Sequence, residues 1–220
     1  MKNLVFLLFL FFIVSAVSAQ KIKGAFSAGL NLSQVDGDEV YGFYKFGFNA
    51  GPSAILPIGK NFLLSVEVIY SQKGSHSTYA PGGDTLPPPY YDLRLTYLDA
   101  PILFHYQDKQ SFTIGTGFSY GRLIKFAEIE HGRSTVFPNS NGPYSTSDIN
   151  WIADVRFRVY GPLKFNFRYS YSLANLRTRT YLNGEIRNQY HNFISARLIY
   201  VFGDTQPIKE KKNKVKKVSK

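Results

Sequence analysis

The chain has 220 residues, a formal net charge of +11 and no cysteine. The absence of cysteine excludes disulfides, zinc–thiolate sites and thiol nucleophiles. The positive charge is concentrated at one end, because residues 203–220 carry seven lysines and two acidic residues. The body of the chain is therefore only mildly basic, and we do not expect nucleic acid as a partner.

The first 19 residues follow the order of a secretory signal peptide. Lys2 supplies positive charge, an apolar run extends from Leu4 to Val14, and small residues end at Ala19. A membrane-spanning helix is the alternative, but such a helix needs about 20 apolar residues. We therefore expect residues 1–19 to be removed on export, and Gln20 in place of cysteine argues against a lipid-modified N-terminus.

Apolar and polar residues alternate from Lys21 onward in eight segments, which is the pattern of half-buried strands. In the third segment, for example, Phe62, Leu64 and Val66 share one face and Leu63 and Ser65 the other. The predicted strands lie at about 22–32, 44–56, 62–72, 93–106, 111–126, 149–159, 163–173 and 189–202.

Short and long connections alternate between these segments. Tight turns near 57–61, 107–110 and 160–162 contrast with longer polar stretches near 33–43, 72–92, 128–147 and 174–188. A transmembrane barrel has this asymmetry, with short periplasmic turns, longer outer loops and an even strand number. The sequence therefore predicts an all-β fold: an eight-stranded antiparallel up-and-down transmembrane β-barrel over residues 20–202, in the bacterial outer membrane.

A soluble sandwich or ligand-binding barrel would show the same alternation with the opposite orientation. The face opposite the apolar residues is rich in Gly, Ser, Thr and Asn, and small residues suit the crowded interior of an eight-stranded barrel. A soluble surface would carry more charge. We therefore expect the apolar face to point toward lipid.

Two segments resemble a known family. Glu67-Val68-Ile69-Tyr70-Ser71-Gln72-Lys73-Gly74 ends one predicted strand, and Tyr97-Leu98-Asp99-Ala100-Pro101-Ile102-Leu103 lies in the next. With a glycine-rich first hairpin, this pair resembles the PorT-like outer-membrane β-barrel family of the Bacteroidetes over about 22–202. The resemblance implies an eight-stranded outer-membrane barrel without implying one activity. Because the name-giving member belongs to a secretion apparatus, it also implies a secretion or gliding accessory role.

Charged residues recur on the face that the predicted barrel turns inward. Buried charge is tolerated only when it is paired, so we predict an internal ion-pair network with Glu67, Asp99 and Asp154 against the arginines. Eight strands leave no open channel, and solute transport is not expected. The predicted network consists of Lys45, Glu67, Asp99, Asp154, Arg156, Arg158, Arg168 and Arg197, with Lys164 on the same faces.

Aromatic residues recur near the predicted strand ends. In outer-membrane barrels, aromatic side chains form girdles at the two membrane interfaces. Simple core packing is the alternative. The predicted interface aromatics are Tyr44, Tyr70, Tyr106, Tyr120, Trp151 and Tyr200.

An enzyme would group an acid, a base and a nucleophile near the outer rim. His76, His131 and His191 lie in or beside predicted outer loops, where Asp84, Asp148 and Ser134 are also found. No spacing ties these residues together, and solvated loop histidines are the simpler interpretation. We therefore expect a non-enzymatic protein with no catalytic residue, no cofactor and no metal.

Residues 203–220 are too polar and charged to pack, which predicts a disordered basic arm in the periplasm. The arm would bind an anionic partner or be simply solvated. We expect a monomeric barrel in outer-membrane lipid, acting as a structural or interaction component of the envelope with an envelope or secretion-system protein as partner. The predicted partner-binding lysines are Lys211, Lys212, Lys214, Lys216 and Lys217.

Overall fold

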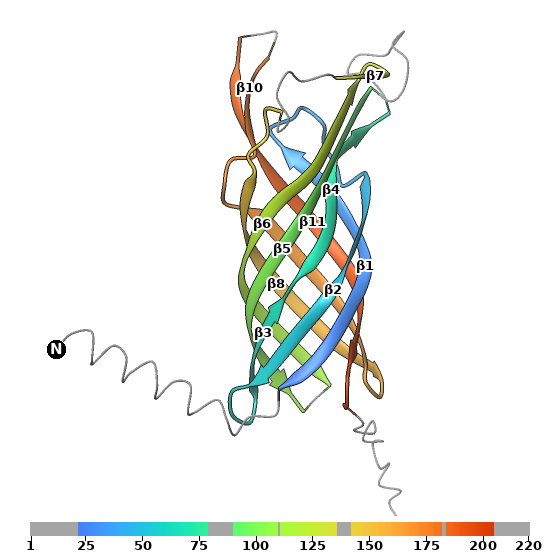
Figure 1. The fold of residues 1–220 in the computed structure, drawn as a ribbon, viewed down its shortest axis with the longest axis vertical. Coiled ribbons are helices and arrows are strands. Elements are labelled where there is room, and N and C mark those ends of the chain that lie inside the picture. Colours follow the sequence, from blue (N-terminus) through green and yellow to red (C-terminus); the bar gives the residue numbers. More distant parts are fainter. Residues whose placement is uncertain (1–21, 79–89, 110, 136–141, 182–183, 205–220) are drawn as a thin grey trace, which may run out of the picture.

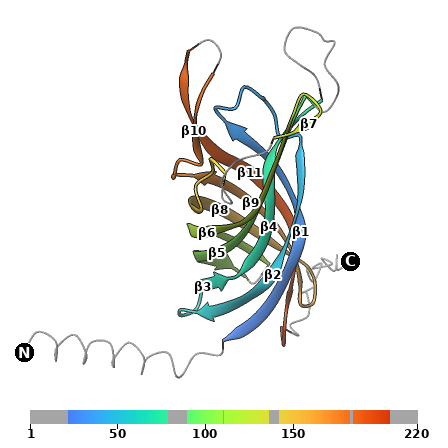
Figure 2. The same ribbon diagram turned by 45° about the horizontal axis from the view of Figure 1, so that its top comes forward.

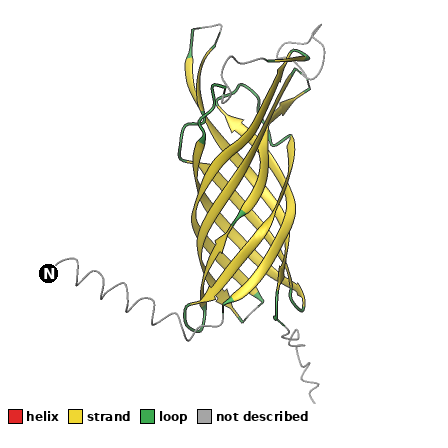
Figure 3. Ribbon diagram, in the orientation of Figure 1, coloured by secondary structure: helices red, strands yellow, loops and turns green. Residues whose placement is uncertain are grey.

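The computed structural model describes residues 22–78, 90–109, 111–135, 142–181 and 184–204. Strands joined by turns make up the described chain (Figure 3). Within these residues, no helix is both long enough and apolar enough to cross a membrane. The predicted signal peptide, and all but the first two residues of the predicted basic arm, lie outside the described residues.

Eleven strand segments form the sheet. Their bounds are β1 (Lys23–Asp36), β2 (Lys45–Pro57), β3 (Phe62–Glu67), β4 (Ile69–Ser77), β5 (Tyr91–Asp108), β6 (Phe112–Glu130), β7 (Arg133–Ser134), β8 (Ser147–Tyr160), β9 (Leu163–Ser172), β10 (Arg177–Thr180) and β11 (Ile186–Val201).

The sheet closes into a ring of eight antiparallel strands, because β3 and β4 share one position and β7 and β10 are short additions at the outer end (Figures 1 and 2). Each of the eight ring positions pairs with the next along the chain, and β1 pairs with β11 from Ala25 opposite Val201 to Asp36 opposite Tyr190. The predicted eight-stranded up-and-down barrel is confirmed. Closure leaves no free sheet edge in the ring.

Pro52 explains why one strand position is split into β3 and β4. Pro52 stands opposite Val68 in the β2 register, and the Val68 amide donates to the Pro52 carbonyl at 3.0 Å. Proline has no N–H to donate in return, so the ladder is interrupted at this point. The two strands approach closely beside it: a Cβ on Gly51 would lie 1.9 Å from the Val68 oxygen.

The apolar side chains point outward along the half of the barrel that carries the tight turns. On β5, Leu98, Ile102 and Phe104 are about half exposed, whereas Asp99 and His105 are buried between them. A soluble barrel would bury its apolar face, so this outward orientation indicates a barrel that crosses a membrane. The tight turns predicted near 57–61, 107–110 and 160–162 all lie at one end (Figure 1).

The alternation inverts toward the outer ends of the strands. On β5, Leu93, Leu95 and Tyr97 point inward and are fully buried, while Arg94 points outward. An apolar interior with a polar exterior is the arrangement for strands surrounded by water. The outer part of the barrel therefore rises beyond the lipid as a cap with a core of its own, formed by Val35, Tyr91, Leu93, Leu95, Tyr97, Tyr144 and Leu176.

This cap shortens all four predicted outer loops. Strand β1 runs to Asp36 in the loop expected at 33–43, and β10 and the start of β11 lie in the loop expected at 174–188. Strands β5 and β6 have 18 and 19 residues, longer than the roughly 10 residues of a transmembrane strand. Strand structure continues to Ser77 and to Glu130, where loops were predicted from about 72 and 128. The physical reason is the outer core, which makes strand pairing favourable beyond the membrane.

Candidate functional site

A buried ion-pair cluster crosses the lumen. The Arg168 guanidinium donates to Glu67 at 2.9 Å and to Asp154 at 3.0 Å. The Arg156 guanidinium bridges the same two carboxylates at 3.0 and 2.7 Å, and Arg197 reaches Glu67 at 3.3 Å. Because all five side chains are at most 5% exposed, each charge depends on its partners rather than on water.

Small residues on the neighbouring strands make room for these long side chains. Gly115 on β6 stands opposite Asp154 on β8. Gly29 on β1 stands opposite Arg197 on β11, where a Cβ would lie 2.8 Å from the Arg197 Cγ. The glycine-rich inward faces thus permit the crowding that eight strands impose.

A second charged cluster lies toward the outer end, and it corrects the predicted role of Asp99. Asp99 pairs with Lys73 at 2.9 Å rather than with the arginines. The Lys73 ammonium is also 3.8 Å from Asp148 and lies 4.6 Å from the centre of the Tyr97 ring. The sequence interpretation missed Lys73 because it treated this position as the end of a strand, although Lys73 continues the inward face of Glu67 by the same period of two.

Lys45 also lies outside the predicted network. It begins β2, and its ammonium pairs with Asp92, which lies beside the exposed Arg94 on β5. On the neighbouring strand β4, Gly74 stands opposite Arg94. Gly74 has no side chain that could block the path of the long Lys45 side chain to Asp92.

Arg158 is the third predicted member with a different partner. It reaches the periplasmic end of the barrel, where it donates to Asp204 at 2.9 Å. Lys23 lies 3.5 Å and Lys164 3.9 Å from the same carboxylate. Burial acts to raise the pKa of Asp204, but the hydrogen bond from Arg158 and the three positive charges outweigh it and lower that pKa. This cluster ties the residues just after β11 to the barrel.

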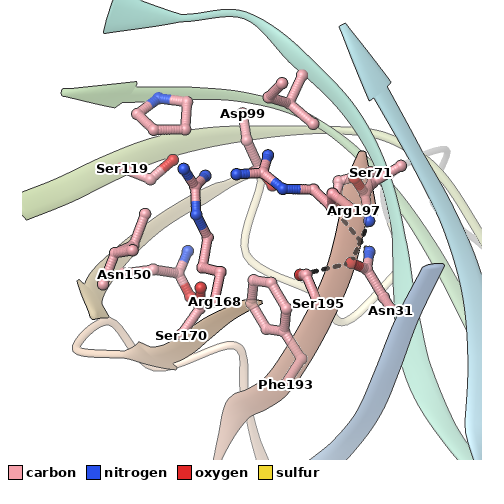
Figure 4. A pocket seen from close by; sticks show the side chains of 14 residues that line it. Asn31, Ser71, Asp99, Ser119, Asn150, Arg168, Ser170, Phe193, Ser195 and Arg197 are labelled. Atoms are coloured by element: carbon pink, nitrogen blue, oxygen red, sulfur yellow. Dashed lines mark hydrogen bonds between the residues drawn. The ribbon is translucent and has the colours of Figure 1, made fainter. Parts of the chain in front are cut away.

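Side chains close the lumen at several levels. Ala25, Ile55, Ile199 and Val201 form a small apolar core at the periplasmic end. Between the two charged clusters lies a cavity of about 20 Å³, which is room for one water molecule. Figure 4 shows the Arg168 and Arg197 side chains from neighbouring strands converging on this cavity. Side chains of the described residues therefore fill the lumen.

The outer cap is locked by a further set of ion pairs. Glu128 is buried on β6 and accepts from Arg177 of β10 at 3.1 and 3.2 Å. The same guanidinium donates to the Tyr144 hydroxyl at 3.0 Å. Arg179 pairs with Glu130. These contacts fix the β10–β11 hairpin against β6, on the opposite side of the cap.

A cleft of about 390 Å³ opens beside this lock. Its walls include Tyr90, Tyr181 and Arg179, and its floor includes Asp38. One Asp38 oxygen accepts from the Val40 amide at 2.9 Å, and the Ser75 hydroxyl interacts with the same carboxyl group. Burial raises the pKa of Asp38 to about 7, so the carboxyl is poised between its two charge states near neutrality.

The model of one protein family, described as the outer membrane protein beta-barrel domain, matches residues 18–177. This chain belongs to that family. The match spans most of the barrel, and it agrees with the closed ring and the outward apolar face. It places the protein in the bacterial outer membrane.

Solved structures of small outer-membrane barrels are similar to this barrel. Neisserial surface protein A is 14% identical with a TM-score of 0.47, covering 81% of this chain and 95% of its own. Ail, the attachment invasion locus protein of Yersinia pestis, is 13% identical with a TM-score of 0.49, covering 82% and 98%. The search among curated proteins found no match.

The six predicted interface aromatics all project from the outer wall of the barrel, at least 39% exposed. Tyr106 and Tyr200 lie one or two residues from the periplasmic strand ends. Tyr70, Tyr120 and Trp151 lie close to the level at which the alternation inverts, and Tyr44 precedes the outer end of β2. These positions suit two girdles, and contact with the lipid interface stays a prediction.

The three histidines of the enzyme alternative lie in different surroundings. His191 was placed beside an outer loop, but it points into the lumen from β11 and lies 3.3 Å from the Tyr97 hydroxyl. His131 packs edge-on against the Tyr90 ring. His76 lies 3.5 Å from Asp92 and 3.5 Å from the Thr78 hydroxyl. Only His76 of the three thus lies between a carboxylate and a hydroxyl among the described residues.

Proposed function

We propose that this barrel is a non-enzymatic interaction protein of the outer membrane that binds an envelope or secretion-system protein at its outer end. The observation that carries the proposal is the contrast between a filled lumen and a cap whose surface has aromatic-lined clefts. A filled lumen leaves the surfaces as the place of function, and tyrosine and arginine are the residues enriched at protein interfaces.

The cap offers two adjoining concave surfaces to such a partner. The first is the cleft of Tyr90, Tyr181 and Arg179. The second, of about 490 Å³, is lined by Tyr41 and Tyr44, which are 85% and 65% exposed. Because the Glu128 lock and the apolar core order the cap, the strands that frame these surfaces are held in place before a partner binds, which lowers the entropy cost of association.

The resemblance to the PorT-like family supports a more specific version, in which the partner belongs to a secretion or gliding apparatus. The basic arm after Asp204 supplies a second contact on the periplasmic side, through Lys211, Lys212, Lys214, Lys216 and Lys217. Its charge suits an anionic surface such as peptidoglycan or an acidic protein patch.

Photocrosslinking in living cells tests the proposal. A crosslinking residue at Tyr41 or Tyr44 should capture one discrete protein, and the substitutions Tyr41→Ala and Tyr44→Ala together should abolish its copurification. The matched control is Tyr160, which is 76% exposed at the periplasmic end of β8 and should not capture that protein. Equal capture from both ends, or capture of lipid alone, would reject an outer binding surface. Deleting residues 205–220 tests the arm separately, with loss of a periplasmic crosslink expected.

An enzyme acting on lipid or peptide at the outer rim is a second candidate, favoured by the position of His76. A triad needs a carboxylate that can balance a forming imidazolium. The Asp92 charge is already balanced by Lys45 and Arg94, which argues against catalysis. If Thr78→Ala and His76→Ala both abolished hydrolysis of an outer-leaflet lipid or a peptide without loss of folding, the enzyme would replace the interaction barrel.

A further inference from the structure

A groove of about 440 Å³ crosses the outer wall of the barrel, at the base of the cap. It is lined by residues of β2, β4, β5 and β6, so it belongs to the rigid sheet rather than to a loop. Its lining combines the cations Lys45, Arg94 and Lys125 with the rings of Phe46 and Tyr70, and it includes Lys73, whose buried ammonium is paired with Asp99. It shares none of its lining with the clefts of the cap.

Positive charge in the groove is only partly balanced. Asp92 is buried against the groove and pairs with both Lys45 and Arg94. Among the described residues, no carboxylate lies within 4.0 Å of the Lys125 ammonium. The groove thus carries one carboxylate, Asp92, for the three cations Lys45, Arg94 and Lys125. The net positive charge that remains would attract an anionic ligand.

A bulge in β6 adds another cation to this wall. The register between β5 and β6 shifts at Thr96 and Tyr97, which inserts one extra residue on β6. Strict alternation would turn Arg122 and Lys125 to opposite faces, yet both are exposed on the outer wall. The Arg122 guanidinium has a neutral partner, the Thr146 hydroxyl at 3.3 Å. The bulge therefore concentrates positive charge on the outward face.

The groove lies at the depth of lipid headgroups. The outward apolar run on β5 extends from Tyr106 to Leu98, about 20 Å along the axis for strands tilted near 40°. That is close to the roughly 25 Å apolar band of an outer-membrane barrel. Arg94 lies four residues beyond Leu98, which is about 10 Å farther out, in the headgroup layer. Tyr70 stands opposite Leu98, and its hydroxyl accepts from Gln72, which stands opposite Thr96 farther out, as suits an interface aromatic.

We propose that this groove binds the phosphate of a phosphorylated glycolipid in the outer leaflet. The Arg94 guanidinium contacts Asp92 through Nε and Nη2, which leaves Nη1 to donate to a phosphate, and Lys125 offers a mobile ammonium beside it. Gln72 and Thr96 also line the groove and offer hydrogen bonds to sugar hydroxyls. Phe46 and Tyr70 pack against the sugar or the upper acyl chains. Fixed lipid of this kind would hold the barrel at one depth and leave the cap clear of the membrane.

Lipid retention tests the assignment. The full chain is reconstituted in phosphatidylcholine nanodiscs containing bisphosphorylated lipid A, extracted into mild detergent, and analysed by native mass spectrometry. The wild-type barrel should retain lipid A. Arg94→Gln with Lys125→Gln should weaken retention about 30-fold, as two cations at a lipid headgroup imply. The control removes two lysines from periplasmic turns, Lys60→Gln with Lys109→Gln, and should retain lipid A like the wild type.

The single substitution Lys125→Gln is not expected to disturb folding, because the Lys125 ammonium has no acidic partner among the described residues. It should weaken lipid A retention about fivefold. Equal retention by the wild type and both groove variants would overturn the proposal. Equal retention of dephosphorylated lipid would overturn the role of phosphate. Inorganic phosphate at millimolar concentration should not displace the lipid, and full displacement would show a site for free phosphate instead.

Discussion

Glu67 accepts hydrogen bonds from three arginines, at 2.9, 3.0 and 3.3 Å, and it is the residue on which the lumen charges converge. Without that carboxylate, Arg156, Arg168 and Arg197 would share Asp154 alone in a dry interior. Each guanidinium would still be removed from water, but it would lose one of the carboxylates that balance its charge. At the residue scale, stability therefore depends on complete sets of partners rather than on single contacts.

We expect Glu67→Gln to destabilise the barrel by about 3–5 kcal/mol, the cost of leaving buried charge uncompensated. The free energy of unfolding can be measured by urea unfolding in detergent micelles, with the heat-modifiable band shift as the readout. The control is Asp108→Asn, whose exposed carboxylate lies 4.0 Å from Lys109 and should change stability by less than about 1 kcal/mol. Equal effects of the two substitutions would show that the cluster contributes nothing special.

Asp38 should make the turn after β1 sensitive to pH. Its pKa is raised to about 7 in the folded cap and stays near 4 when the turn opens. Below about pH 4 both forms are protonated. Between about pH 4 and 7 the opened form loses its proton first, so the closed turn loses stability as the pH rises.

Hydrogen exchange of residues 37–42, corrected for intrinsic rates, should show at least about tenfold more protection at pH 5 than at pH 8, since each unit between the two pKa values is worth a factor of ten. Asp38→Asn should remove the difference, and the exposed Glu39→Gln should keep it. The same pH dependence in Asp38→Asn would assign the effect to another group.

At the scale of elements, β5 and β6 each carry two environments. Leu98 and Phe104 face lipid near the turn, while Leu93 and Leu95 pack inside the cap. Strand β10 has the sequence Arg-Thr-Arg-Thr with no buried residue, and it depends on Glu128 to hold Arg177. Hydrogen bonds to charged groups are worth about 1.5–3 kcal/mol each, enough to decide whether a short hairpin stays docked.

Glu128→Gln should release the β10–β11 hairpin while leaving the transmembrane barrel folded. Protease added to intact cells should cleave between residues 177 and 188 about tenfold faster than in the wild type, because the loss of one such bond favours opening by that factor. Glu185→Gln, which removes an exposed carboxylate paired with Arg187 in the same hairpin, should leave cleavage unchanged. Faster global unfolding without local cleavage would contradict this role.

For the whole molecule, the layers of the lumen predict an electrically silent barrel. The apolar plug, the two charged clusters and the outer core follow one another along the axis. Reconstituted in a planar lipid bilayer at neutral pH, the protein should give no steady conductance. A 16-stranded porin treated in the same way is the control, since it has an open channel. Stable single-channel openings would contradict the filled lumen and the proposal that function lies on the surfaces.

Much of the barrel could be predicted from the sequence because side-chain direction along a strand is a local property with a period of two. Ser65, Glu67 and Ser71 had to share a face once the segment was a strand, and that face is the lumen. The alternating lengths of turns and loops then predicted the ring and its orientation. The signal peptide and the basic arm after Asp204, with its lysines, stay predictions, because they lie outside the described residues.

The partners of the lumen charges were decided by the tertiary structure. Glu67 and Arg197 are 130 residues apart, and only the register and tilt of strands around the closed ring bring them together. The same geometry pairs Asp99 with Lys73, Lys45 with Asp92 and Arg158 with Asp204. The level at which lipid gives way to water is likewise a property of the assembled barrel, because a single strand cannot show where its neighbours stop facing the membrane.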